Sequence, residues 1–325
     1  MDKRFLDRLP NIRDFKEDVI NNICKVYEIG KPLNHKIIET GYEDFNFVLM
    51  TNKGKFFVKI FSKERKRDDC ERIVRLIEML IKKGVHHPPL YRNTKNASLY
   101  EIRINDSESI LLCVMKYIEG KNYFDLKEMP KKEEIRKLAK DLAHINSIKL
   151  DEEIPHIYDS WAIVNFAKEY KKKEQYLEEK EREILNPILE EFKSTDIDSL
   201  PKALVHGDLL KTNVIRDKQN QPWIVDFSVA NIYPRILEIA ITATHILFDP
   251  NSKEDTENNL EILLEEYEKE IVLTKEEKEA LPKFIRFSYG IELLNTIFEK
   301  RARKNESEEN NALMKEAIRG LEWEM

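Results

Sequence analysis

A short segment with strand-like patterning, residues 203–230, interrupts a C-terminal half that otherwise has the periodicity of helices. Within it, one apolar run leads into His206 and Asp208, and Asn213 follows the aspartate by five positions. A second apolar run ends at Asp226. Each of these residues alone would suit an ordinary turn. Polar groups at the ends of neighbouring strands also converge on ligands, because the packed strands hold them still. The combination therefore predicts a ligand site.

This combination resembles the aminoglycoside phosphotransferase and choline kinase family. The string His-x-Asp-x4-Asn followed by Asp-Phe is similar to the catalytic loop and metal-binding strand of that family, a two-lobed relative of the protein kinases. Ser228 stands where protein kinases have glycine, which favours the small-molecule branch. The resemblance extends over roughly residues 36–325. It implies an α+β, bilobal, protein-kinase-like fold with a small β-sheet lobe and a larger helical lobe.

The resemblance assigns a task to each polar residue of the segment. Asp208 is expected to accept or orient the proton of the substrate hydroxyl as general base. Asn213 and Asp226 are expected to bind Mg²⁺ through oxygen atoms, which this ion prefers. His206 is interpreted as a structural residue, and Lys211 as a solvent-exposed side chain.

The hydrophobic pattern predicts where the two lobes begin and end. Apolar spacing predicts a helix over 13–29, a β-hairpin over 45–61, a helix over 69–82, and strands over 98–104 and 109–117. Beyond Gly120, helices are expected over about 131–148, about 160–193 and most of 254–325. We therefore expect a nucleotide-binding lobe over 1–117, including the N-terminal helix, and a catalytic and substrate-binding lobe over 118–325.

The N-terminal hairpin carries a lysine that fits the same family. Lys59 ends an apolar strand, in the manner of the kinase strand whose lysine binds the α- and β-phosphates of ATP. An acidic residue of the following helix is expected to orient it by an ion pair. Glu71 is the first candidate, and Glu78 is the alternative.

Other nucleotide contacts are implied by the resemblance alone. Gly41 and Asn46 lie in a loose Gly-x-x-x-x-Asn turn, similar to the phosphate-covering turn of the aminoglycoside and homoserine kinase branch. Met115 and Tyr117 lie where the family has its hinge, whose backbone groups would meet adenine. Glu238 stands where the family has an aspartate that braces the catalytic loop, and its role here is left open.

Charge and composition exclude several classes of protein. The net charge of −6 argues against a protein that coats nucleic acid, which needs a clustered cationic surface. The basic runs at 63–67 and 168–173 are flanked by acidic residues. The three cysteines have no zinc-site spacing, and no apolar stretch is long enough to cross a membrane. With no signal-peptide pattern at the N-terminus, the expected location is the cytoplasm.

Together these observations predict a kinase that uses ATP and Mg²⁺ to phosphorylate a hydroxyl group of a small molecule. The residues around Trp161 and after Asp226 resemble the homoserine kinase branch, and choline-like or aminoglycoside-like acceptors remain open. Two alternatives are a kinase that acts on protein or RNA, supported by the basic runs, and a nucleotide-binding module without catalysis. The sequence leaves the oligomeric state open.

Overall fold

The protein is described from a computed structural model that covers residues 17–38, 44–103, 109–150 and 154–324. The described residues form two compact units. The first comprises the described part of Met1–Lys82 together with His87–Glu119, and the second comprises Lys83–His86 and the described part of Gly120–Met325. Each unit is considered by itself.

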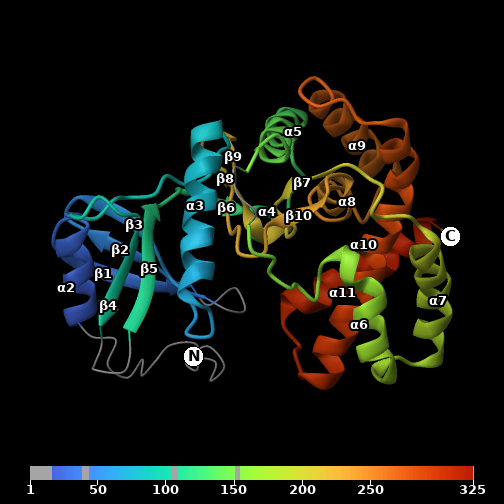
Figure 1. Ribbon diagram of the computed structural model, residues 1–325, viewed down its shortest axis with the longest axis horizontal. Helices are drawn as coiled ribbons and strands as arrows, with labels where there is room; N and C mark the ends of the chain where they lie inside the picture. The colour runs from blue at the N-terminus through green and yellow to red at the C-terminus, as the bar shows by residue number, and fades with distance from the viewer. Residues whose placement is uncertain (1–16, 39–43, 104–108, 151–153, 325) are drawn as a thin grey trace. The chain divides into compact units, whose positions relative to one another are not determined.

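The first unit contains an antiparallel sheet of five strands in the order β1-β2-β3-β5-β4 (Figure 1). Its elements are α2 (Glu17–Val26), β1 (Pro32–Ile38), β2 (Phe45–Thr51), β3 (Gly54–Ile60), α3 (Arg67–Lys83), β4 (Leu99–Arg103) and β5 (Ser109–Lys116). The hairpin β2–β3 has the register that places Asn46 opposite Lys59 and Thr51 opposite Gly54.

The alternation of side chains along these strands separates the face that packs on α2 from the opposite face. Phe45, Phe47 and Leu49 of β2 belong to the same buried cluster as Val58 and Ile60 of β3, and this cluster includes the apolar face of α2. Because successive residues of a strand point to opposite faces, Asn46 and Lys59 lie on the other face of the sheet. Figure 1 shows α3 on the side of the sheet away from α2.

The second unit is mainly helical and carries two small sheets. One sheet has the strand order β6-β8-β9 and the other pairs β7 with β10 (Figure 1). The strands are β6 (Gly120–Asn122), β7 (Lys202–Val205), β8 (Val214–Asp217), β9 (Pro222–Ile224) and β10 (Asn231–Pro234). The helices are α4 (Tyr123–Leu126), α5 (Lys132–Asn146), α6 (Phe166–Lys173), α7 (Glu179–Ser194), α8 (Ile236–Thr244), α9 (Lys253–Tyr267), α10 (Lys275–Ala302) and α11 (Glu308–Glu324).

Strand β1 and helix α8 are among the elements that the sequence pattern does not predict, each for a physical reason. Strand β1 is mostly exposed, so it lacks the apolar alternation that marks a half-buried strand. Helix α8 is buried on every side and reads Ile-Leu-Glu-Ile-Ala-Ile-Thr-Ala-Thr, so it has no polar face to give a helical period. The predicted β2–β3 hairpin and the helix 69–82 are present. In the described residues, all three cysteines are free and buried, and no helix combines the length and apolarity needed to cross a bilayer.

Candidate active site

The catalytic loop begins where β7 ends, and His206 fixes its first turn. The imidazole of His206 is fully buried, with Nε2 2.9 Å from the carbonyl oxygen of Val225. Its Nδ1 accepts a hydrogen bond of 3.2 Å from the backbone N–H of Asp208. Burial lowers the pKa of His206 to about 4, so the ring is neutral and can accept this bond. This supports the interpretation of His206 as a structural residue.

Glu238 holds the same turn from the opposite side. It lies in α8, is fully buried, and its Oε2 accepts a hydrogen bond from the backbone N–H of His206. Burial raises the pKa of Glu238 to about 7, and hydrogen bonds from the backbone of His206 and Gly207 partly oppose that rise. Gly207 itself has φ +81°, a conformation that side chains rarely adopt. Glu238 therefore does brace the loop, despite being one methylene longer than aspartate.

Asp208 and Asn213 are in direct contact at the two ends of the loop. The amide Nδ2 of Asn213 donates to the Asp208 carbonyl oxygen at 2.8 Å and to its carboxylate Oδ2 at 2.9 Å. The 3₁₀ turn Lys211–Asn213 makes this return possible within five residues. Because Nδ2 faces Asp208, the side-chain oxygen is the remaining atom of Asn213 that could bind a cation.

Asp226 is brought to this cluster by β9 and by a hydrogen bond between the two segments. The backbone N–H of Val225 donates to the Asn213 carbonyl at 2.9 Å, which aligns the end of β9 with the catalytic loop. Asp226 has φ +67°, an unusual conformation for a non-glycine residue and one that clusters at functional sites. Ser228, in place of the protein-kinase glycine, donates to Oδ1 of Asp226. Phe227 is fully buried, with its ring 4.4 Å from that of His206.

Asp159 is a third carboxylate near Asp208 that the sequence pattern did not indicate. Burial raises the pKa of Asp208 well above its usual value, and the charges of Asp159 and then Asp226 raise it further. Asp159 accepts a hydrogen bond of 2.9 Å from the backbone N–H of Trp161. In the sequence Asp159 is an ordinary acidic residue two positions before Trp161. Only the three-dimensional structure shows that Asp208 is its neighbour.

The donor set of this cluster suits a hard divalent cation. Two carboxylates and one amide oxygen come from Asp208, Asp226 and Asn213, and Mg²⁺ prefers oxygen ligands. Among the described residues, Asp208 forms no ion pair with a basic side chain. Its raised pKa reflects burial first and then the charges of Asp159 and Asp226, and a bound cation would offset both effects. No group of three or more His, Cys, Asp and Glu side chains with metal-binding geometry occurs in the part of the chain that is described. Such an ion would therefore need further oxygen ligands from a phosphate or water.

In the first unit, Lys59 is paired with Asp44 rather than with the predicted Glu71. The Lys59 ammonium is 2.8 Å from Asp44 Oδ2, and both side chains are almost fully buried. Asp44 Oδ1 also accepts from Arg65 Nε at 2.9 Å. Glu71 is exposed and pairs with Arg67 at 3.3 Å, so the expected Lys59–Glu71 ion pair is wrong for this structure. The physical reason is the position of Glu71 around the helix, because its side chain lies on the solvent-exposed side of α3.

The alternative, Glu78, is also engaged elsewhere. It accepts hydrogen bonds from Ser98 Oγ at 2.5 Å and from Arg92 at 3.1 Å. Asp44 precedes β2 and was not singled out in the sequence, because an acidic turn residue gives no sign of a lysine fifteen positions further on.

The remaining predicted nucleotide contacts are on the same unit as Lys59, except for Gly41, which lies outside the described residues. Asn46 faces Lys59 across the hairpin, and its Oδ1 is buried without a hydrogen-bond partner among the described residues. Met115 is buried in β5, and Tyr117 follows the strand, half-buried. The backbone N–H of Lys116, between them, donates to the Pro89 carbonyl at 2.9 Å.

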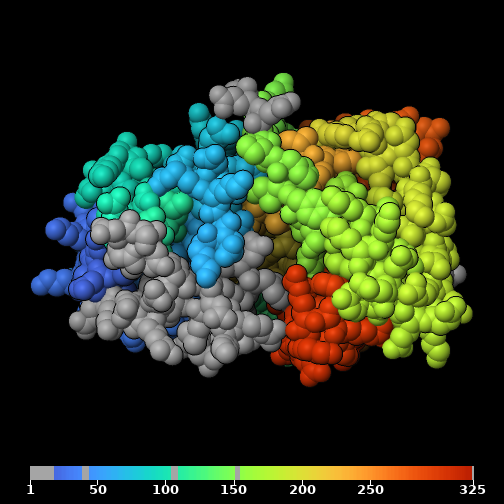
Figure 2. Space-filling view, turned by 60° about the horizontal axis from the view of Figure 1, so that its bottom comes forward, coloured from blue at the N-terminus to red at the C-terminus, as the bar shows by residue number. Residues whose placement is uncertain are grey.

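Several cations of the basic runs are paired with carboxylates or lie over an aromatic ring. On α6, Lys172 and Lys173 both pair with Glu169, and the ammonium groups of Lys168 and Lys172 lie over the Tyr158 ring. Figure 2 shows this part of the chain, in green, beside the red C-terminal helices. In the other run, Arg65 pairs with Asp44, and Arg67 with acidic neighbours. Arg65, Arg67, Lys172 and Lys173 are thus balanced locally by carboxylates.

Lys211 differs from its expected state. Its side chain is only 18% exposed and its ammonium is 2.6 Å from Glu316 in α11. The expectation of a solvent-exposed lysine was wrong because the pairing residue lies 105 positions further along the chain.

The chain matches a family of known enzymes over most of its length. Residues 34–271 match the phosphotransferase enzyme family. The homoserine kinase of Agrobacterium fabrum is 25% identical over 283 residues, covering 85% of this chain and 83% of that protein. The homoserine kinase of Methylobacillus flagellatus is 22% identical over 280 residues, covering 84% and 83%.

Solved structures share the fold at low sequence identity. Amicoumacin kinase hAmiN, in complex with AMP-PNP, Ca²⁺ and Ami, matches with a TM-score of 0.71 at 15% identity, over 99% of this chain and 96% of that one. Choline kinase LicA from Streptococcus pneumoniae matches with a TM-score of 0.63 at 17% identity, over 94% and 99%. These likenesses confirm the predicted protein-kinase-like α+β fold. The chain therefore belongs to the phosphotransferase enzyme family and is a kinase that transfers phosphate to a hydroxyl group.

Proposed function

We propose that the protein transfers the γ-phosphate of ATP, with Mg²⁺, to the hydroxyl group of a small amino alcohol, homoserine being the first candidate. The observation that carries this proposal is the cluster of Asp208, Asn213 and Asp226, held by backbone and side-chain hydrogen bonds at the end of two strands. Phosphoryl transfer depends mainly on positioning and on electrostatic stabilisation, and this cluster supplies both.

Each residue of the cluster has a separate task in this proposal. Asp208 accepts the proton of the acceptor hydroxyl, and its raised pKa makes it a stronger base than an ordinary aspartate. The Asn213 amide fixes the orientation of the Asp208 carboxylate through the 2.9 Å hydrogen bond. Asp226 and the Asn213 oxygen would hold Mg²⁺. When bound, that ion neutralises charge on the phosphate oxygens.

Nucleotide binding is assigned to the face of the first-unit sheet that carries Lys59. Lys59 would contact the α- and β-phosphates. Asp44 would orient Lys59 through their ion pair, the role that was expected of Glu71. Asn46 offers a side-chain amide beside that lysine, and Gly41 belongs to the same turn in the proposal. The backbone groups of Met115 and Tyr117 would meet adenine. The amicoumacin kinase structure, which holds AMP-PNP and Ca²⁺, supports the use of a nucleotide with a divalent cation.

The charge near Asp208 favours an acceptor that bears an ammonium group. Asp159 and Asp226 both raise the pKa of Asp208, so the potential there is negative, and a cationic group would lower the repulsion. The relatives identified as homoserine kinases match more than four-fifths of the chain, which supports homoserine as the first candidate to test. The pairing of Arg65, Lys172 and Lys173 with carboxylates weakens the support for a macromolecular substrate.

The test is a steady-state assay with ATP, Mg²⁺ and a panel of acceptors. L-homoserine, choline, ethanolamine and an aminoglycoside differ in carboxylate and ammonium content. We expect acceptor-dependent ADP formation with homoserine at a kcat/KM at least ~10-fold above the others, the ratio that a difference of about 1.4 kcal/mol in transition-state binding produces. If none of these four acceptors were phosphorylated, the result would contradict the proposal. Turnover with another of them would keep the reaction and change the substrate.

A further inference from the structure

We propose that helix α11 positions the catalytic loop through Glu316, which holds Lys211. This inference rests on the proposed function, since it treats Asp208 and Asn213 as the residues that the loop must align. The 3₁₀ turn Lys211–Asn213 is the connection between those two residues. A contact that fixes this turn therefore also fixes the separation of the base from the proposed metal ligand.

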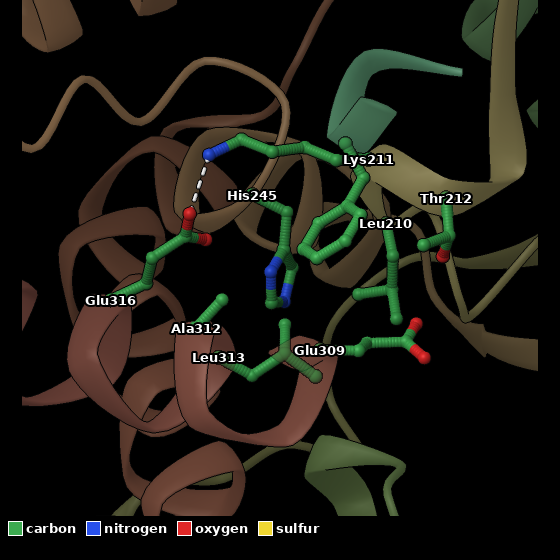
Figure 3. Close-up of a pocket in the computed structure, with 9 residues that line it drawn as sticks. Leu210, Lys211, Thr212, His245, Glu309, Ala312, Leu313 and Glu316 are labelled. Atoms are coloured by element: carbon green, nitrogen blue, oxygen red, sulfur yellow. Dashed lines mark hydrogen bonds and ion pairs between the residues drawn. The ribbon is translucent and has the colours of Figure 1, made fainter. Parts of the chain in front are cut away.

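One face of α11 is aligned with the loop. Residues 309, 312, 313 and 316 recur at the spacing i, i+3, i+4 and i+7, which places them on one side of a helix. They line a small cavity together with the loop residues Leu210–Thr212 and with Phe124 and His245. Figure 3 shows Glu316 reaching Lys211 at one end of this face, while Glu309 lies towards Thr212 at the other.

The ion pair between Lys211 and Glu316 is short and shielded from water. The Lys211 ammonium lies 2.6 Å from Glu316 Oε1, and the two side chains are 18% and 17% exposed. Electrostatic attraction is stronger where water is excluded, so this pair constrains the loop more than a surface pair would. Burial raises the pKa of Glu316, and the charge of Lys211 opposes that rise.

His245 and Glu292 form a buried layer behind the Lys211–Glu316 ion pair. His245 Nδ1 is 3.7 Å from Glu292 Oε1, and both side chains are buried. Neither carboxylate oxygen of Glu292 has a hydrogen-bond partner in the described part of the chain. Burial raises the pKa of Glu292 well above its usual value, a rise that the charge of Lys211 opposes, and burial lowers the pKa of His245 to about 3. Glu316 is the carboxylate that lies within ion-pair distance of the Lys211 ammonium.

Helix α11 packs closely against neighbouring parts of the second unit. A Cβ at Gly320 would collide with the ring of Tyr289 in α10, so the two helices approach closely at this point. Trp323, near the end of α11, packs on Phe248 with ring centroids 5.0 Å apart. A support that is fixed at this end can hold the loop in one position.

A competing explanation predicts the opposite change in rate. If Glu316 instead withheld Lys211 from a phosphate group, removal of its charge would raise activity. Under the positioning role, removal of either charge lowers kcat. Misplacement of reacting groups by about 1 Å costs on the order of 10²-fold in rate, and this sets the expected scale.

The experiment compares Glu316→Gln, Lys211→Met and Lys211→Arg in the full-length chain. We expect kcat to fall by ~10²-fold in Glu316→Gln and in Lys211→Met, with KM for ATP within about twofold of wild type. Lys211→Arg keeps the charge and should retain most of kcat. The double variant should be no slower than either single variant, because both remove one interaction.

Glu308→Gln is the matched control. Glu308 lies beside Glu309 on α11 and forms an exposed ion pair of 3.1 Å with Lys127, outside the catalytic loop. It should leave kcat unchanged, since exposed pairs contribute little. An unchanged or increased kcat in Glu316→Gln would overturn the positioning role.

Hydrogen exchange tests the inference without any acceptor. Peptides that cover residues 206–213 should exchange faster in Glu316→Gln and Lys211→Met than in wild type, and not in Glu308→Gln. If wild type phosphorylates no acceptor but the exchange difference is present, the proposed function fails while the structural coupling stands. If exchange is equal in all proteins, the inference fails even when the kinase activity is real.

Discussion

Two opposing influences act on the pKa of Asp208. Burial and the charges of Asp159 and Asp226 raise its pKa, and the hydrogen bond from Asn213 lowers it. The Asp208→Ala substitution removes the proton acceptor and leaves the nucleotide contacts in place. We therefore expect kcat to fall by about 10²- to 10⁴-fold, with ATP affinity nearly unchanged, as measured by steady-state kinetics and calorimetry.

Asp198→Ala is the control for this substitution. Asp198 is 91% exposed and pairs only with Lys202 at 2.7 Å, so its removal should change neither kcat nor ATP affinity. If Asp208→Ala turned over at the wild-type rate, Asp208 would have no part in proton transfer. The protein would then need another base near the acceptor hydroxyl.

Glu238 makes stability depend on pH. Its pKa is raised from 4.5 to about 7 by burial, so the folded state binds the proton more tightly than the unfolded state. The stabilisation is complete below about pH 4.5 and is lost as pH rises to about 7, on the order of 3 kcal/mol in total. The neutral variant Glu238→Gln lacks this loss. We expect urea unfolding to show its stability increasing relative to wild type by about that amount between about pH 4.5 and pH 8.

A stability difference that stays constant across this range would show that Glu238 titrates normally in the folded protein. The hydrogen bonds from the backbone of His206 and Gly207 would then outweigh burial. The site would still be braced, but by a carboxylate that is charged at neutral pH.

At the scale of the elements, Lys59 on strand β3 and Glu71 on helix α3 are expected to differ in their effect on nucleotide binding. Lys59 is buried against Asp44, whereas Glu71 on α3 is exposed. Lys59→Met should therefore weaken ATP binding by ~10- to 100-fold, the loss of one charge-assisted contact to phosphate. Glu71→Gln should leave it within about twofold, because an exposed ion pair contributes little. Equal losses in the two variants, measured by calorimetric titration, would restore Glu71 as the orienting residue.

The elements also show why part of the site could be predicted from the sequence and part could not. His206, Asp208, Asn213 and Asp226 follow two strands within 21 positions, so local spacing alone indicated that they would meet. Glu316 reaches the loop from 105 positions away, on a helix whose acidic residues resemble a solvated face. The sequence carries no signal for such a contact, because the packing of the whole helical unit determines it.

At the scale of the whole molecule, ligand binding should be visible as a change in thermal stability. A ligand that binds only the folded chain stabilises it by about 2.7 kcal/mol at 100 times its Kd. For a chain of this size that corresponds to a rise in Tm of roughly 3 to 8 °C. We expect this rise with ATP and Mg²⁺ together, and a smaller one with ATP in the presence of EDTA.

Asp226→Asn distinguishes the metal-dependent part of this effect. The substitution keeps the size of the side chain and removes the negative charge that the cation would neutralise, so Mg²⁺ should add little to the Tm rise that ATP alone produces. Asp198→Asn, on the exposed side chain that pairs with Lys202, should behave as wild type. If Asp226→Asn showed the full Mg²⁺-dependent rise, the cation would bind through the triphosphate alone. The positive φ of Asp226 and its hydrogen bond from Ser228 would then serve the loop rather than the metal.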